Sequence, residues 1–300
     1  MEKELEKTIQ DIKDLKIQGN TNIAKAAVKA LLNYITHTKV HNFEVFKQKI
    51  KYYAFALAEA RPNEPIAYNA MTYILAHIDE CENQQELRVK MIDKIEQFFK
   101  YIDESYEVIR TNAMMILKNY SRFITHCHSS LVRDTLIGIN KVKKIRVFQS
   151  ETRPKFQGRI TAEKLTQNSV HVIHYVDSFI SSIVLDNRYE NPEVAIVGSD
   201  GITLNGDLVN KIGTYSLALA CYEANIPFFV VTQTMKLDPR SKDLEKFLIE
   251  LRSPDEVWDY THDNIHIINP AFDLVPAKYI TGGYITEKGL IKPEDIKDLI

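Results

Sequence analysis

The spacing of apolar residues changes near residue 118, and this change constrains the fold more than any other feature of the chain. Before it, apolar residues recur every three or four positions, as in NIAKAAVKALLNYI at 22–35, and glycine occurs once, at Gly19. This period predicts about five helices. After it, short runs rich in β-branched residues alternate with helical segments. The runs are RFITHC (122–127), IRVFQS (145–150), HVIHYV (171–176), EVAIVG (193–198), PFFVV (227–231) and NIHIIN (264–269).

Apolar runs separated by helices are typical of a parallel sheet that is covered on both faces. We therefore predict an α/β protein with an N-terminal all-helical domain, residues 1–118, followed by a Rossmann-like parallel-sheet domain, residues 119–300. Ligands of such sheets bind where the strands end. Polar residues that directly follow the runs are therefore the first candidates for a functional site.

Composition narrows the class of protein. A formal net charge of -2 argues against a general nucleic-acid partner, which usually requires a basic excess. Apolar stretches are too short to span a membrane, and MEKELEKTIQDIKDLK at the N-terminus indicates a charged amphipathic helix rather than a signal peptide. Three widely spaced cysteines do not suggest a disulfide framework. We expect a cytoplasmic protein with reduced thiols and no membrane partner.

Cys127 lies in THCHSS (125–130), at the end of the first predicted strand. Because side chains alternate along a strand, the two flanking histidines should face away from the thiol, which makes a shared metal ion improbable; we predict no metal. Ser129 or Ser130 can cap a following helix, and a helix N-terminus lowers a thiol pKa. Free cysteine is also a common core residue. The local sequence leaves a core thiol and a reactive thiol equally open.

Asp200 follows another apolar run, in EVAIVGSDG, between Gly198 and Gly201. A carboxylate next to a buried strand is costly unless it is paired, protonated or used in chemistry. Two such residues at two strand ends suggest one shared cleft. The alternative is an ordinary turn or helix-capping acid.

Asn210 and Lys211 lie in NGDLVNKIGT (205–214), where we expect them to open a helix and to form an anion site. The alternative is a solvated lysine. Another polar group, SETRPKFQGR (150–159), follows a predicted strand that Pro154 should end. Its Arg153 could bind a phosphate with two hydrogen bonds, or could simply pair with Glu151.

Two irregular stretches interrupt the helical half. IQGN contains Gly19 and precedes a helix expected near Thr21, and ARPNEPIAYN contains Arg61 and precedes a helix expected at Pro65. Both stretches could be ordinary helix boundaries.

Several motifs taken together resemble one family. They are VFQSETRPKFQGR, THCHS, VGSDGITLNGDLVNKIGT, ELRSPDEVW and INPAFDLVPAKYIT with YITEKG, and, more thinly in the helical half, QGN and ARPNEP. The family includes ribose-1,5-bisphosphate isomerase, methylthioribose-1-phosphate isomerase and the regulatory subunits of translation initiation factor 2B. Its enzymes carry a catalytic cysteine and aspartate at the positions of Cys127 and Asp200, whereas the regulatory subunits typically lack one or both.

The resemblance also implies substrate contacts. These fall on Gly19, Arg61, Gln157, Asn210 and Lys211; Asn20 beside Gly19 and Arg153 are further candidates. One departure matters, because the family enzymes usually have Arg-Gly-Ala where this chain has Gln18-Gly19-Asn20. That change removes a phosphate contact and leaves the substrate open.

The function that the resemblance implies is an aldose–ketose isomerase for a C1-phosphorylated pentose, first of all ribose 1,5-bisphosphate to ribulose 1,5-bisphosphate in nucleoside salvage. We expect Asp200 to act as acid and Cys127 as base, or both to stabilise charge during a hydride shift. No cofactor is expected, and the partners are a small sugar phosphate and further copies in a dimer or hexamer. The alternatives are a non-catalytic regulatory subunit that binds a nucleotide or sugar phosphate, and a methylthioribose-1-phosphate isomerase.

Overall fold

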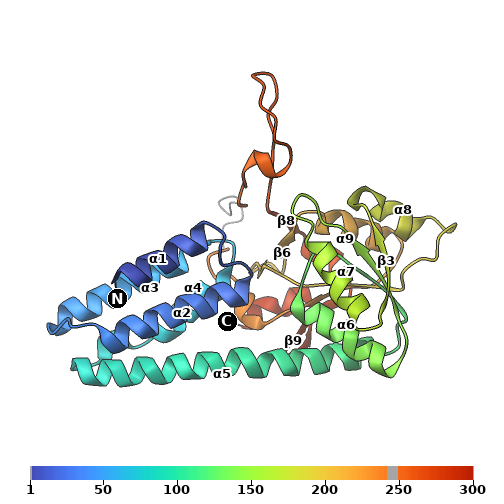
Figure 1. Cartoon of the computed structure of the whole chain (residues 1–300). Coiled ribbons are helices and arrows are strands. Elements are labelled where there is room, and N and C mark those ends of the chain that lie inside the picture. Colours follow the sequence, from blue (N-terminus) through green and yellow to red (C-terminus); the bar gives the residue numbers. More distant parts are fainter. Residues whose placement is uncertain (1, 242–248, 300) are drawn as a thin grey trace. The chain divides into compact units, whose positions relative to one another are not determined.

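A computed structural model describes residues 2–241 and 249–299 (Figure 1). The chain forms two compact units. The first contains the residues up to Glu104 together with Met235–Asp238, and the second contains Ser105–Thr234 with the described residues from Pro239 onward. Each unit has its own core, and each is described separately below.

The first unit is helical, as predicted. It contains α1 (Glu2–Lys13), α2 (Asn20–His37), α3 (Phe43–Ala58), α4 (Pro65–Leu75), the short η1 (Ile78–Glu80) and the first part of α5 (Gln84–Leu117). Apolar residues at helical spacing fill its core, among them the fully buried Leu31, Phe46 and Phe98. The prediction of five helices before residue 118 is confirmed for the described residues, and α4 begins at Pro65 as expected. The two units divide within α5, whereas α5 itself ends at Leu117, next to the predicted boundary.

The second unit is built on a seven-stranded, mostly parallel sheet, which confirms the predicted fold class. Its order is β10-β9-β7-β4-β1-β2-β3, and only β9 and β10 pair antiparallel. The strands are β1 (Arg122–Thr125), β2 (Arg146–Ser150), β3 (His171–Tyr175), β4 (Val194–Val197), β7 (Phe228–Val231), β9 (Gly283–Thr286) and β10 (Gly289–Ile291). In the centre, β1 pairs with β4 on one side and β2 on the other. The chain segments that follow β4, β1 and β2 therefore leave the same edge side by side.

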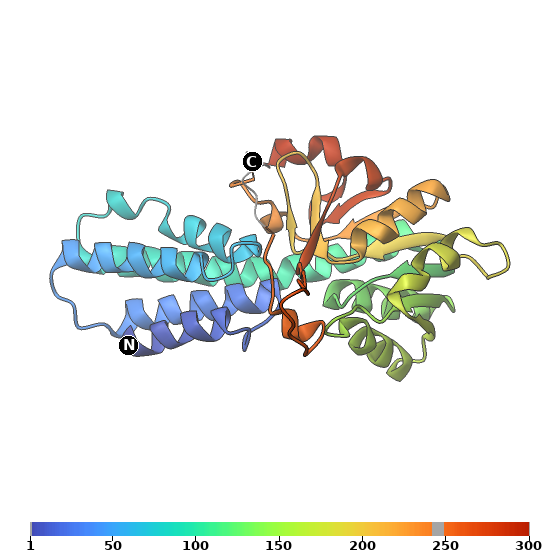
Figure 2. The ribbon, with the colours of Figure 1, turned by 90° about the horizontal axis from the view of Figure 1, so that it is seen from above.

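Helices lie on both sides of this sheet. Figures 1 and 2 show α6 (Ser130–Val142) and α7 (Gln157–Gln167) on one side, and α8 (Ile180–Leu185) and α9 (Thr214–Glu223) on the other. A small antiparallel sheet, β5-β6-β8, adjoins the carboxyl edge and consists of β5 (Gly201–Ile202), β6 (Leu208–Lys211) and β8 (Phe272–Val275). Short 3-10 turns complete the unit: η2 (Asp177–Phe179), η5 (Pro254–Glu256), η6 (Ala277–Tyr279) and η7 (Pro293–Leu299). A further turn, η3 (Thr234–Lys236), begins in this unit, and its Met235 and Lys236 belong to the first.

Two sequence expectations about single elements are wrong. NIHIIN at 264–269 is not a strand; its Ile265 and Ile268 are exposed by 43% and 67%, and the strand of this region begins at Phe272. Two of the three isoleucines of this run face solvent, so its apolar character does not reflect the packing of a buried strand. Asn210 and Lys211 end β6 rather than open a helix, because α9 begins at Thr214. Within the described part of the chain, no helix is both long and apolar enough to cross a membrane.

Candidate functional site

Cys127 occupies the turn between β1 and α6. Strand β1 ends at Thr125, and Cys127 has a left-handed backbone with φ 65, which is uncommon for a residue with a side chain. Ser129 caps α6, as predicted, because its hydroxyl accepts a hydrogen bond from Val132 N. The strand therefore stops two residues before the thiol, and the turn rather than the pleat sets the direction of Cys127.

Burial raises the pKa of the Cys127 thiol to about 12. The nearby positive charge of Lys211 and a hydrogen bond from the backbone of His128 lower it, while the negative charges of Asp200 and Asp177 raise it further. Desolvation of the thiolate is thus the larger effect. The direction of this shift is opposite to the one that a helix N-terminus alone would produce.

Asp200 follows β4, the strand that pairs with β1, so it emerges next to Cys127 at the carboxyl edge. Its carboxylate is near enough to act on the pKa of the thiol. Gly198 allows the segment after β4 to lie close to the start of α6, because a Cβ at that position would lie 2.8 Å from the Cβ of Ser129. The sequence identified both strand ends, and the sheet order makes them neighbours.

The two histidines beside Cys127 have separate protein partners. Nδ1 of the buried His126 lies 2.6 Å from Ser150 Oγ, and its Nε2 lies 2.8 Å from the carbonyl oxygen of Ile212. Because a carbonyl can only accept, Nε2 carries the hydrogen of neutral His126; burial lowers the pKa of this imidazole. His128 contacts Thr161 instead. Among the described residues, no three His, Cys, Asp or Glu side chains are grouped so that they could hold a metal ion.

Lys211 and Asn210 lie at the end of β6. Asn210 is buried and donates to Thr214 Oγ1 at 3.0 Å, so it organises the turn into α9. The N-terminus of α9 is already occupied, because the carboxylate of Asp273 accepts from the backbone N–H groups of Gly213 and Tyr215 at 2.8 and 2.9 Å. The predicted anion site at this helix start is therefore filled by a protein carboxylate. The charge of Lys211 acts instead beside Cys127.

Gln157 begins α7, directly after the loop that follows β2. Its Oε1 is buried and, in the described structure, accepts no hydrogen bond. Gln157 and Lys211 line one small pocket together with Lys155, Arg252, Glu256 and Asn269. The enclosed space is only about 10 Å³, which is room for one water molecule, and Glu256 already pairs with Lys155 and Arg252.

Arg153 does not pair with Glu151, which was the structural alternative to a phosphate contact. It is exposed and donates to the carbonyl oxygen of Val257 at 2.9 Å. Glu151 pairs with Arg159 instead, at 2.7 Å. Strand β2 ends at Ser150, before Pro154, because the chain turns at Thr152, which has φ 63.

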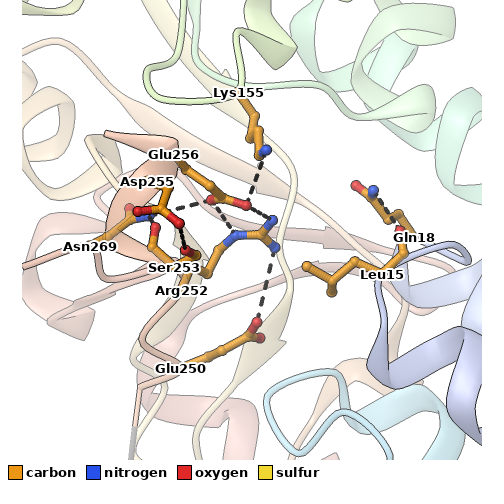
Figure 3. A network of polar contacts seen from close by, with 9 residues as sticks. All are labelled: Leu15, Gln18, Lys155, Glu250, Arg252, Ser253, Asp255, Glu256 and Asn269. Atoms are coloured by element: carbon orange, nitrogen blue, oxygen red, sulfur yellow. Dashed lines mark hydrogen bonds and ion pairs between the residues drawn. The ribbon is translucent and has the colours of Figure 1, made fainter. Parts of the chain in front are cut away.

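Sequence reasoning did not single out the polar network beside this pocket. Figure 3 shows Lys155 and Arg252 reaching Glu256 from different directions, with distances of 3.1 Å to Lys155 Nζ and 2.5 Å to the Arg252 guanidinium. Asn269 donates to the same carboxylate and to Ser253 O. The hydrogen bond from Arg252 and the one from Lys155 lower the pKa of Glu256 to about 2. The motif ELRSPDEVW contains Arg252 and Glu256 at a spacing of four, which was the available signal.

In the first unit, Gly19, Asn20 and Arg61 lie around the start of α4. Gly19 precedes α2 with φ 86, and the buried Asn20 accepts from the backbone N–H of Ile66 at 3.3 Å. Arg61 is buried and pairs with Glu64, the residue before α4, at 3.1 Å. Gln18 donates to Leu15 O at 2.8 Å (Figure 3). The structure thus brings together the three candidate residues of the helical half.

A mostly parallel sheet with helices on both sides defines an α/β protein, and a thiol, a carboxylate and a lysine lie at the carboxyl edge, where such folds bind their ligands. The chain belongs to the initiation factor 2 subunit family (IF-2B), whose model matches residues 16–293. It is 35% identical to a ribose 1,5-bisphosphate isomerase of Methanocaldococcus jannaschii, over 97% of this chain and 92% of that protein. It is 33% identical to a methylthioribose-1-phosphate isomerase of Thermoanaerobacter pseudethanolicus, over 94% and 86%. A solved structure of translation initiation factor eIF-2B from Pyrococcus horikoshii has a TM-score of 0.80 and 26% identity, and the match covers 96% of this chain and 97% of that one.

Proposed function

We propose that this protein is an aldose–ketose isomerase that acts on a C1-phosphorylated pentose, with ribose 1,5-bisphosphate as its substrate and ribulose 1,5-bisphosphate as its product. The observation that carries the proposal is the placement of Cys127 and Asp200 after two adjacent parallel strands, within electrostatic reach of each other. Relatives named ribose 1,5-bisphosphate isomerase that match nearly the whole chain support this choice.

The chemistry needs two groups that exchange protons. Ring opening breaks the bond between C1 and the ring oxygen, which must receive a proton. Isomerisation then moves a proton from C2 to C1, while the hydroxyl on C2 loses its proton to become the ketone. Two residues can complete this cycle if each gives and takes one proton.

The pKa of Cys127 favours this residue as the acid and Asp200 as the base, which is the reverse of the roles expected from the sequence. A thiol with a pKa of about 12 holds its proton at neutral pH and is well matched to a leaving alkoxide, so Cys127 protonates the ring oxygen. Asp200 takes the proton from C2 and delivers it to C1. The Cys127 thiolate then takes the proton of the C2 hydroxyl. Until it does so, the positive charge of Lys211 stabilises the thiolate.

The test is incubation with ribose 1,5-bisphosphate and, separately, methylthioribose 1-phosphate in D₂O, with NMR of the product. Turnover of ribose 1,5-bisphosphate supports the proposed activity, and deuterium at C1 of the product rules out a hydride shift. A product without deuterium is compatible with both routes, because Asp200 delivers to C1 the same proton that it takes from C2. If Cys127 starts as the acid, kcat/KM stays level through neutral pH and falls as the thiol ionises at high pH. If Cys127 must first become a thiolate, kcat/KM rises with pH instead.

A regulatory subunit is the second candidate, because Gln18 stands where the family enzymes usually have arginine and because a structure named as an initiation factor covers nearly the whole chain. A regulator binds a nucleotide or sugar phosphate without converting it. Binding by calorimetry with no product from either pentose phosphate would favour this function.

A further inference from the structure

The peptide groups on both sides of Cys127 are held by two threonine hydroxyls. The Cys127 N–H donates to Thr152 Oγ1 at 3.0 Å, and the Cys127 carbonyl accepts from Thr161 Oγ1 at 2.9 Å. Both threonines are fully or almost fully buried. They belong to different elements, since Thr152 lies in the loop after β2 and Thr161 lies in α7. Water does not compete for these bonds, so each hydroxyl limits where the cysteine can lie.

These bonds hold a backbone conformation that the residues would not adopt alone. Cys127 has φ 65 and Thr152 has φ 63, both in the left-handed region that disfavours residues with a Cβ, and β-branched threonine most of all. Such conformations persist only where the surroundings fix them from several directions. Here the Thr152 N–H donates to Asp177 at 2.8 Å, and Gln149 Nε2 adds a second hydrogen bond to the Cys127 carbonyl at 3.2 Å.

The proton on the Thr161 hydroxyl can be assigned. Thr161 donates its only hydroxyl hydrogen to the Cys127 carbonyl, because a carbonyl cannot donate. It must therefore accept from Nδ1 of His128, which lies 2.9 Å away. Thr161 thus links the residues on both sides of the Cys127–His128 peptide, and it fixes the N–H that points to the Cys127 sulfur.

We propose that Thr152 and Thr161 are positioning residues, which hold Cys127 in a left-handed turn and so fix the direction in which its sulfur faces the substrate. The kinetic part of this inference rests on the proposed function. The part that concerns thiol geometry does not, because it can be measured without any substrate.

The test compares valine variants of three buried threonines. Thr152→Val and Thr161→Val remove the two hydroxyls, while Thr135→Val is the matched control, since Thr135 is fully buried in α6 and its hydroxyl has no hydrogen-bond partner in the described structure. Thr161→Ser keeps the hydroxyl and should behave like the wild type. The first measurement is the rate at which iodoacetamide alkylates Cys127 between pH 7 and 10, followed by peptide mass spectrometry that separates it from the buried Cys81 and Cys221.

We expect alkylation of Cys127 to be several-fold faster in Thr152→Val and Thr161→Val than in Thr135→Val, because the released turn exposes the thiol to water. If the enzyme turns over a pentose phosphate, kcat should fall at least roughly tenfold with little change in KM, since misplacement of about 1 Å costs up to 10²-fold. Unchanged alkylation in both variants, with unfolding temperatures equal to that of the control, would overturn the inference. An altered alkylation rate in a protein without turnover would support it and refute the proposed activity instead.

Discussion

Gly158 offers the sharpest test of how the site is built. It is the second residue of α7, and a Cβ placed on it would lie 1.8 Å from the backbone oxygen of Ser150 and 2.9 Å from Gln149 Nε2. Its backbone does not require glycine, so the restriction is purely steric. Gly158→Ala therefore forces the start of α7 and the end of β2 apart by about 1.6 Å to reach ordinary contact.

The size of the effect follows from what must move. Overpacking a well-packed site costs about 1–3 kcal/mol, and the clash here is with backbone, which cannot rotate away. We expect Gly158→Ala to lose about 3 kcal/mol of unfolding free energy. At roughly 2–4 °C for each kcal/mol, the unfolding temperature should fall by about 6–12 °C. Activity should also fall, because Gln149 holds the Cys127 carbonyl.

Gly138→Ala is the matched control. Gly138 is also helical, but its added Cβ would meet the flexible end of Met114 at 2.6 Å, which can turn aside. Alanine also has a helix propensity about 1 kcal/mol better than glycine, which offsets this contact. The unfolding free energy of Gly138→Ala should therefore differ little from that of the wild type. Thermal unfolding of the two variants side by side decides the matter. Equal unfolding temperatures would show that α7 is free to shift, and would refute the argument that close packing against β2 fixes the site.

The remaining predictions concern charged groups. Asp200→Asn should bind the sugar phosphate as well as the wild type but lose roughly 10² to 10⁴ in kcat, and equal turnover would remove Asp200 from the mechanism. Lys211→Ala should weaken binding in calorimetry while stability stays within about 1 kcal/mol; unchanged binding would make it a solvated lysine. Glu256, whose pKa is lowered to about 2 mainly by Arg252, stabilises the fold fully above its unfolded pKa of 4.5, and this stability is lost as the pH falls toward 2. In acid titrations Glu256→Gln should therefore lose less stability than the wild type between pH 5 and 2, by up to about 3 kcal/mol, and parallel curves would contradict the assignment.

The sequence by itself determined the class of fold and the places where chemistry could lie. Before residue 118 the apolar residues have helical spacing and glycine occurs once, and after it the apolar runs are rich in β-branched residues. Both patterns are local, because they depend only on which side chains must face a core. For the same reason Cys127 and Asp200 could be recognised, since each lies within three residues of the end of a buried strand. The family motifs could be read directly because they are contiguous.

Only the tertiary structure decided how those places combine. Strand order made β1 and β4 neighbours, and no local pattern encodes the order of strands in a sheet. The run NIHIIN was apolar enough for a strand, but its exposed isoleucines do not face a core. Lys211 ends a strand because β6 pairs with β8, which comes from a distant part of the chain. The protonation of Cys127 was decided in the same way. A helix terminus is visible in the sequence, but the burial that outweighs it comes from residues folded around the thiol, and desolvation is a property of the assembled site.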